Sequence, residues 1–206
     1  MKTLALLFLS TLTLAGCKKT ADPPAQSAAG SATAKPTEPD RIEVFARHLP
    51  AAGKEDLASD PVVVHFDKFS VAKARFDPKN LEGGTATLVL DPTSIKTGNE
   101  ERDADLKTAD YIDVAKFSTI TVDVANVKKQ TDAKYTADAT VACHGLTKTY
   151  PVTFEVLATT SSSVTIKGEQ AFSRLDFGIG IDPATDPTER IAAPLTIQWV
   201  LTLKNT

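Results

Sequence analysis

The stretch KYTADATVACHGLTKTYPVTFEV, residues 134–156, alternates apolar and polar side chains on both sides of one turn. The residues that share one phase are Tyr135, Ala137, Ala139, Val141 and Cys143 before the turn, and Tyr150, Val152, Phe154 and Val156 after it. Strict alternation with a period of two predicts a β-strand with one dry face and one wet face. His144-Gly145 is a turn signal, so the stretch predicts two consecutive antiparallel strands.

The same periodicity recurs along the rest of the chain. It predicts strands over residues 42–48, 62–76 (bent near Asp67 and Lys68), 82–91, 120–125, 164–172 and 195–203. One-sided strands must close on themselves or cover a second sheet, and serial order favours a barrel over a Greek-key sandwich. The predicted fold is all-β, an eight-stranded antiparallel up-and-down barrel. Asn99 is a good helix N-cap ahead of Glu100 and Glu101, which predicts one short helix over residues 100–109.

The interior of such a barrel is either filled by side chains or left open for one small ligand. Several inward positions carry small residues, among them Gly168, and they face large aromatic ones, which favours a slot. The alternative is that large neighbours fill in over the small residues, as they do in dense cores. The predicted lining of the slot is Ala137, Ala139, Val141, Cys143, Phe154, Ile166, Phe172 and Trp199.

The N-terminus has the pattern of an export signal. Lys2 precedes an apolar run over residues 4–14, too short to span a bilayer, and Leu14-Ala15-Gly16-Cys17 follows. A Cys directly after small residues is the lipobox pattern of bacterial lipoproteins, although an ordinary Cys in a secretory segment is the alternative. We therefore expect residues 1–16 to be removed as a signal peptide and Cys17 to be lipidated.

The residues after Cys17 predict a tether rather than a fold. Residues 18–40 contain no Val, Ile, Leu or aromatic residue, so they cannot bury enough apolar surface to offset the entropy of ordering. We expect residues 17–40 to form a lipidated, disordered linker that spans roughly 25 Å as a coil. The barrel domain then occupies residues 41–206. The expected place is the cell envelope, anchored to a membrane on the periplasmic side, and Lys18 rather than Asp favours the outer membrane.

Charge and composition argue against several functions. The formal net charge of −3 at pH 7 gives no basic field for nucleic acid. His48, His65 and His144 are too few and too scattered for a recognisable metal site, and there is no Gly-x-Ser-x-Gly motif. With Cys17 taken by lipid, Cys143 has no disulfide partner. We expect no catalytic residues, no metal and no cofactor other than a possible bound lipid; the oligomeric state is not predicted.

Three polar motifs interrupt the apolar pattern. They lie within RDADLKTADYIDVAKFSTITV (residues 102–122), HGLTKTYPVTFEV (144–156) and FSRLDFGI (172–179). In this order, in a β-rich exported chain, they resemble the YceI family of bacterial lipid-binding proteins. The resemblance implies a lipocalin-like eight-stranded barrel that binds a long isoprenoid or similar amphiphile and is not an enzyme. The sequence departs from the family at Asp105, where the family usually has His, and over residues 48–61, which look like an insertion.

The polar residues of these motifs are candidates for contact with a ligand head group or for the barrel mouth. They are Arg102, Asp103, His144 and Arg174. Each also has a structural reading. Arg102 and Asp103 would tie the helix to the barrel by an ion pair. His144 would be a turn residue before Gly145, and Arg174 would lock the Phe177-Gly178 corner. The leading hypothesis is an envelope lipoprotein that stores, transports or sequesters an isoprenoid, quinone-like or fatty chain. The alternative is a structural or interaction domain of the envelope with a filled barrel and no ligand.

Overall fold

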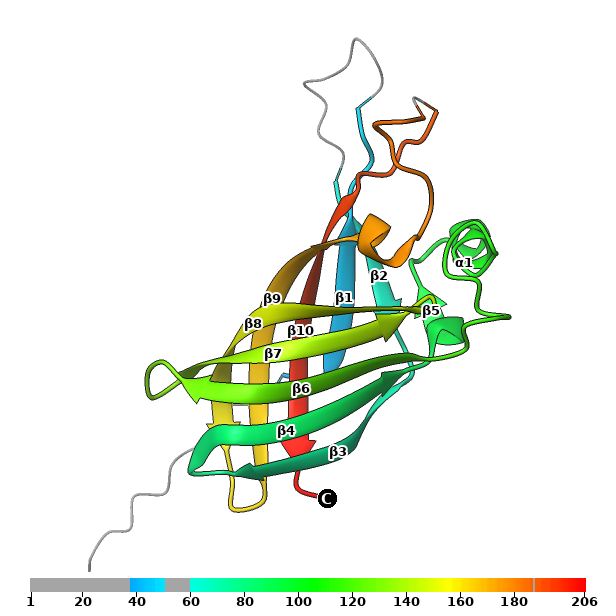
Figure 1. Ribbon diagram of the computed structural model, residues 1–206. Helices are drawn as coiled ribbons and strands as arrows, with labels where there is room; N and C mark the ends of the chain where they lie inside the picture. Colours follow the sequence, from blue (N-terminus) through cyan, green and yellow to red (C-terminus); the bar gives the residue numbers. More distant parts are fainter. Residues whose placement is uncertain (1–37, 51–59, 187) are drawn as a thin grey trace, which may run out of the picture. The chain divides into compact units, whose positions relative to one another are not determined.

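The computed structural model describes residues 38–50, 60–186 and 188–206, and these residues form one curled antiparallel sheet (Figure 1). The proposed signal peptide, Cys17 and most of the linker lie outside the described residues. The strands are β1 (Arg41–Ala46), β2 (Val62–Phe66), β3 (Phe69–Asp77), β4 (Asn80–Leu90), β5 (Ile95–Lys96), β6 (Ile120–Lys129), β7 (Lys134–Cys143), β8 (Leu146–Thr159), β9 (Ser163–Ser173) and β10 (Pro194–Lys204). The helical elements are η1 (Pro92–Ser94), α1 (Glu100–Asp105) and η2 (Arg174–Phe177). No helix among these is long and apolar enough to cross a bilayer.

The strand order confirms the up-and-down arrangement and corrects the strand count. The order is β3-β4-β6-β7-β8-β9-β10-β1-β2-β5, so chain neighbours are mostly sheet neighbours, and β1 returns to pair with β10. Ten strands replace the predicted eight for two reasons. Residues 62–77 bend at Asp67 and Lys68, whose amides donate to Ser94, and this bend separates β2 from β3. The two-residue β5 then pairs with β2.

The predicted helix is present and shorter than expected. The Asn99 side chain accepts from the Arg102 amide at 2.9 Å, which confirms the N-cap. Beyond Asp105 the amides of Lys107 and Thr108 bond three residues back instead of four, and the Thr108 hydroxyl also donates to the Asp105 carbonyl. This tighter turn ends α1 at Asp105 rather than near residue 109.

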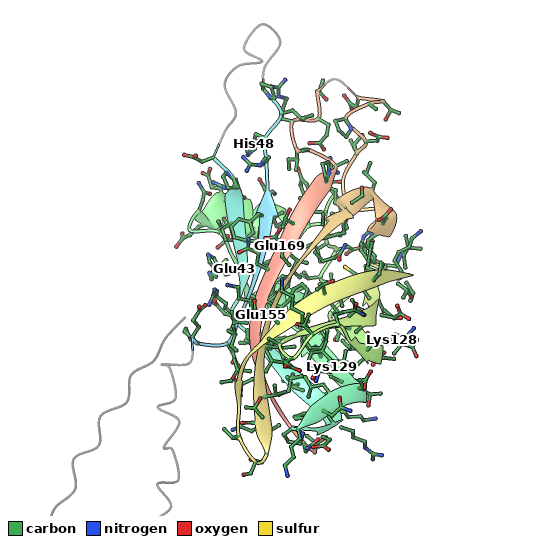
Figure 2. The ribbon with its side chains drawn as sticks, turned by 90° about the vertical axis from the view of Figure 1, so that its left-hand side faces the viewer. Glu43, His48, Lys128, Lys129, Glu155 and Glu169 are labelled. Carbon is green, nitrogen blue, oxygen red and sulfur yellow. The ribbon has the colours of Figure 1, made fainter. Side chains whose placement is uncertain are left out.

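The predicted strand phases hold. Ala139 and Cys143 point inward and are buried, whereas the Thr140 and Thr149 hydroxyls meet at 2.9 Å on the outside. Figure 2 shows Glu43, Glu155 and Glu169 on the outer face of the sheet. Burial raises the pKa of the Cys143 thiol to about 11. Cys143 is therefore a protonated, sheltered side chain at neutral pH.

The single tryptophan lies flat against the inner wall. Trp199 pairs with Gly168 across β9 and β10, and a Cβ atom at Gly168 would collide with the indole ring. The missing side chain is therefore what allows the ring to approach the sheet. Gly168 lies on the inward phase, as predicted, but its space is taken by Trp199.

The loop between β9 and β10 lies at one end of the curled sheet and is drawn in orange at the top of Figure 1. Arg174 fastens this loop: its guanidinium donates to four carbonyls, at 2.7–3.2 Å, and lies 3.6 Å from the Glu189 carboxylate. The four acceptors are the carbonyls of Ile179, Ile181, Ile191 and Ala192. The Ala192 amide also donates to the Arg47 carbonyl at 2.9 Å, so the loop is tied to the chain beyond β1. The predicted corner lock at Arg174 is confirmed, and it fastens a longer stretch than the corner alone.

We expect Arg174→Ala to lower the free energy of unfolding by more than about 3 kcal/mol, because it leaves buried carbonyls and Glu189 without their donor. Urea unfolding followed by circular dichroism measures this loss. Arg102→Ala is the matched control, because no hydrogen bond or ion pair to the described residues ends on that guanidinium, and its cost should stay below about 1 kcal/mol. Equal losses in the two variants would contradict the role given to Arg174.

We expect Cys143 to react slowly with a bulky maleimide at neutral pH and rapidly after unfolding, because it is 8 % exposed and its thiol is protonated. The measurement uses a Cys17→Ser background, which leaves Cys143 as the only thiol in the chain. A Cys143→Ser, Thr149→Cys chain in the same background places a thiol on the exposed outer face and should react quickly. Fast native labelling of Cys143 would show that the phase of β7 is wrong.

Candidate functional site

The inner face of the curled sheet encloses a cavity of about 480 Å³. This volume falls within the range of small-molecule binding sites. Its walls come from all ten strands together with α1, the residues that follow α1, and η2. Most of the lining side chains are aliphatic or aromatic. The cavity is therefore a mostly apolar space inside the curled sheet.

Seven of the eight predicted lining residues reach this cavity. They are Ala139, Val141, Cys143, Phe154, Ile166, Phe172 and Trp199. Ala137 does not line it, although it points inward and is only 4 % exposed. Its neighbours explain this, because Tyr135 and Phe154 stack beside it with ring centroids 5.6 Å apart, and Val152 is its cross-strand partner. Large side chains thus fill the space over Ala137, while the space over Ala139 stays open.

Several strands that line the cavity were missing from the predicted set. β1 and β2 contribute Ile42, Val44 and Val64, and β4 contributes Ala86 and Leu88. These residues follow the same period of two that predicts the strands, so their inward phase was available from the sequence. What the period does not show is which inward residues face open space and which face each other.

The residues after α1 supply a part of the wall that no periodicity predicted. Leu106, Tyr111 and Ile112 line the cavity from an irregular segment, which is shaped by hydrogen bonds from the Tyr111 amide to the Thr108 carbonyl and from the Ile112 amide to the Leu106 carbonyl. Burial raises the pKa of the Tyr111 hydroxyl, with Glu189 acting in the same direction. Tyr111 therefore stays protonated and remains a hydrogen-bond donor at neutral pH.

Asp103 has a structural position and does not line the cavity. Its carboxylate accepts from both the amide and the hydroxyl of Thr97 at 2.7 Å, and Lys96 lies 3.7 Å away. The hydrogen bond from the Thr97 hydroxyl is the main cause that lowers the pKa of Asp103. These contacts tie α1 to β5, as the structural reading of this residue predicted.

His144 also lies outside the cavity lining. It has a left-handed backbone conformation with φ 51° and precedes Gly145, with φ 76°, in the turn between β7 and β8. Its Nδ1 atom lies 2.8 Å from the Phe177 carbonyl oxygen, and its ring packs edge-on against Phe117. His144 therefore joins this turn to η2.

Arg174 and Arg102 both line the cavity, but their side chains differ in what they bind. The guanidinium of Arg174 donates hydrogen bonds to the loop carbonyls described above, and the residue is only 2 % exposed. Arg102 is partly buried, and its guanidinium forms no hydrogen bond or ion pair within the described part of the chain. Of the four predicted polar candidates, the structure brings these two arginines to the cavity and leaves Asp103 and His144 behind its wall.

An aromatic cluster forms the wall beside Arg174. Tyr150, Phe172 and Phe177 line the cavity with ring centroids 6.3–6.4 Å apart. The Tyr150 hydroxyl donates to Asp176 at 2.8 Å, and burial together with this bond raises its pKa. The hydroxyl is therefore committed to Asp176, and Tyr150 presents mainly its ring to the cavity.

The arrangement as a whole suits binding of an elongated apolar molecule. No three His, Cys, Asp or Glu side chains of the described ranges lie close enough together to hold a metal ion. The polar side chains that line the cavity belong mostly to α1, the segment after it and the end beside the β9–β10 loop, and His48 lies beyond the end of β1 (Figure 2). The cavity therefore has long apolar walls and a more polar end.

Similar sequences agree with this architecture. The YceI-like domain family matches residues 38–203. Protein YceI of an Escherichia coli strain is 37% identical over 81 residues, which cover 39% of this chain and 40% of that protein. A UPF0312 protein of Vibrio campbellii is 32% identical over 80 residues, which cover 39% of this chain and 41% of that protein. The matched segment thus spans about two fifths of these curated relatives.

Solved structures share the fold at low sequence identity. BcnA of Burkholderia cenocepacia has a TM-score of 0.68 at 20% identity, with 80% of this chain and 96% of that chain covered. A polyisoprenoid binding domain from Saccharophagus degradans has a TM-score of 0.61 at 15% identity, with 81% and 94% covered. The family match covers nearly all of the described residues, and the curled antiparallel sheet is common to these structures. This chain therefore belongs to the YceI-like domain family.

Proposed function

We propose that the barrel binds one long apolar amphiphile, an isoprenoid, a quinone-like lipid or a fatty chain, inside the cavity. The observation that carries this proposal is the cavity of about 480 Å³ between aliphatic and aromatic walls. Each methylene group moved from water into such a space contributes roughly 0.8 kcal/mol. A long tail gains most from this arrangement, because the apolar lining continues over several strands.

Relatives support the choice of ligand class. The structurally similar domain from Saccharophagus degradans is described as polyisoprenoid binding. Its fold matches this chain over most of both lengths, so a similar tail is a reasonable occupant here. The proposed role is non-enzymatic, because the polar groups that look reactive in the sequence have structural partners: Asp103 holds Thr97, His144 holds Phe177, and Arg174 holds the loop.

The N-terminal sequence supports an anchored form of this binding domain. We propose that Cys17 carries the lipid and that the chain is held at the periplasmic side of the envelope. Lys18, rather than Asp, directly after the lipidated cysteine favours the outer membrane. The described chain enters the barrel beside the end of β10, where Asp40 accepts from the Thr202 amide at 2.9 Å. This point lies at the opposite end of β1 from the loop that Arg174 fastens (Figure 1). A flexible tether at that point leaves the domain free to store, carry or sequester its lipid.

Ala139→Phe should abolish binding of a polyprenol while the stability of the empty protein holds or rises, because the new ring occupies open cavity. In a filled barrel the same change would overpack the core and cost about 1–3 kcal/mol. Binding is followed by the fluorescence of Trp199, the only tryptophan and a lining residue, and stability by urea unfolding.

Thr140→Ser, on the outer face of the same strand, is the control and should change neither quantity. A destabilised Ala139→Phe variant, together with a wild type that binds no polyprenol, would favour the structural domain with a filled barrel.

Cys17→Ala should give an unlipidated precursor that is not processed normally, because the acyl acceptor of the lipobox is gone. Cells fed a fatty-acid analogue report this directly: the wild type should carry label and the variant should not. Label retained on the variant would rule out Cys17 as the attachment site.

A further inference from the structure

Two large apolar side chains are exposed at the end of the sheet beside the β9–β10 loop. Leu146, the first residue of β8, is 46 % exposed, and Ile181, in the loop at the top of Figure 1, is 53 % exposed. Leu157 is the third such side chain in the described ranges, but it lies roughly 35 Å further along β8. Scattered apolar residues are ordinary on a protein surface, so the meaning of Leu146 and Ile181 depends on what surrounds them.

Leu146 and Ile181 flank one short piece of backbone at the edge of the cavity. The Leu146 Cδ1 atom lies 3.9 Å from the place that a Cβ atom on Gly178 would occupy. Gly178 comes shortly before Ile181 in the chain, and Ile179 between them lines the cavity. Neither Leu146 nor Ile181 lines the cavity itself. The two side chains therefore form an apolar surface next to the lining, which we call the rim patch.

The backbone under the rim patch is held in place. The carbonyls of Ile179 and Ile181 each accept a hydrogen bond from the Arg174 guanidinium at 2.7 Å. In the turn that leads into β8, the His144 Nδ1 atom lies 2.8 Å from the Phe177 carbonyl oxygen. Both exposed side chains are thus carried by backbone that is fastened to η2, which keeps them at the surface.

A long apolar tail needs a route into and out of the cavity that avoids water. Each methylene group that must pass through water slows release by roughly fourfold, so a long tail leaves very slowly by that route. When an apolar surface of the protein touches a bilayer, the tail passes from one apolar environment to the other. The rim patch adjoins the lining at Ile179 and is placed for such contact.

The size and charge of the rim patch suit a bilayer better than a protein partner. A stable protein–protein interface buries roughly 800 Å² on each partner, and two side chains beside a glycine supply only a fraction of that area. Exposed Lys148 lies close to Leu146 in the chain, whereas Asp182 follows Ile181, so the nearest charges oppose each other. Contact would therefore depend on apolar burial, which the hydrocarbon of a bilayer provides.

The sequence between the proposed lipid and the barrel is long enough to permit this contact. Residues 18–40 could extend to at most roughly 75 Å, whereas the 11 residues of β10 span about 36 Å. The rim patch can therefore reach the membrane that holds Cys17, even though the chain enters the barrel at the other end. Tethering keeps the effective concentration of bilayer near the patch high, so weak insertion by two side chains is sufficient.

We propose that Leu146 and Ile181 touch a lipid bilayer and that the ligand passes between the bilayer and the cavity at the rim patch. The inference rests on the proposed function, because only an apolar occupant needs such a passage. It adds the partner, which is a membrane surface, and the place of contact.

Loading kinetics test the passage. The processed lipoprotein is reconstituted in phosphatidylcholine vesicles and mixed with vesicles of the same lipid that carry a polyprenol, and loading is followed by Trp199 fluorescence. We expect the Leu146→Ser, Ile181→Ser double variant to load about tenfold more slowly than the wild type, because it has lost both inserting side chains. Final occupancy should be equal, because neither residue lines the cavity.

Two further variants complete the kinetic test. Leu157→Ser removes an exposed apolar side chain from the far part of the same strand and should load at the wild-type rate. Leu146→Ile, Ile181→Leu keeps the patch apolar and should also load at the wild-type rate. Urea unfolding confirms that each variant is folded.

The contact itself is measured without any ligand. Ile181→Cys and Leu157→Cys chains are labelled with an environment-sensitive maleimide, for which acylated Cys17 and buried Cys143 do not compete. The labelled chains are anchored in vesicles of phosphatidylcholine that is brominated in its acyl chains. We expect bromine to quench the probe at residue 181 and to leave the probe at residue 157 bright.

Two results would overturn the inference. The first is a double variant that loads as fast as the wild type, and the second is a probe at residue 181 that is quenched no more than the probe at residue 157. Either result leaves the proposed function intact, because the final polyprenol occupancy of the wild type is measured separately. A wild type that takes up no polyprenol would overturn the proposed function and the passage together, whatever the probes report.

Discussion

The inward side chains of the curled sheet are too small in places to fill the space that the sheet surrounds. The cavity is the part of that space which they leave open. Ala86 and Ala139 present only methyl groups to the interior, while the hydrogen-bonded ladder of neighbouring strands keeps the opposite walls apart. Where large side chains do meet, as Tyr135 and Phe154 do, the same interior packs solidly. A single sheet can therefore have a dense core at one level and an open space at another.

The polar residues of the three sequence motifs have separate tasks, which their contacts show. Asp103 and His144 hold pieces of backbone together behind the wall, and Arg174 secures the loop between β9 and β10. The guanidinium of Arg102 forms no hydrogen bond or ion pair with the described residues. Sequence motifs that look alike in polarity thus differ in whether their side chains hold the described structure together.

Sequence periodicity accounts for much of this structure and has a definite limit. It predicted the strands, their inward phase and seven of eight lining residues, because alternation follows directly from the geometry of a β-strand. It also predicted the bend near Asp67 and Lys68, but it could not show that this bend would divide residues 62–77 into two strands, or that Ala137 would be covered while Ala139 stayed open. Tyr111 escaped prediction for a different reason, since an irregular segment has no period and its position depends on tertiary contacts.

The attachment of the β9–β10 loop through Arg174 has a consequence for acid conditions. Arginine keeps its charge at every pH that a protein survives, and backbone carbonyls do not titrate. The four bonds from Arg174 to the carbonyls do not depend on the contact with Glu189 at 3.6 Å. The attachment of the loop to Arg174 therefore does not depend on a histidine. Within the loop, however, the Asp186 carboxylate accepts from the hydroxyl and the amide of Thr188, and these bonds lower its pKa, so acidification weakens the loop there.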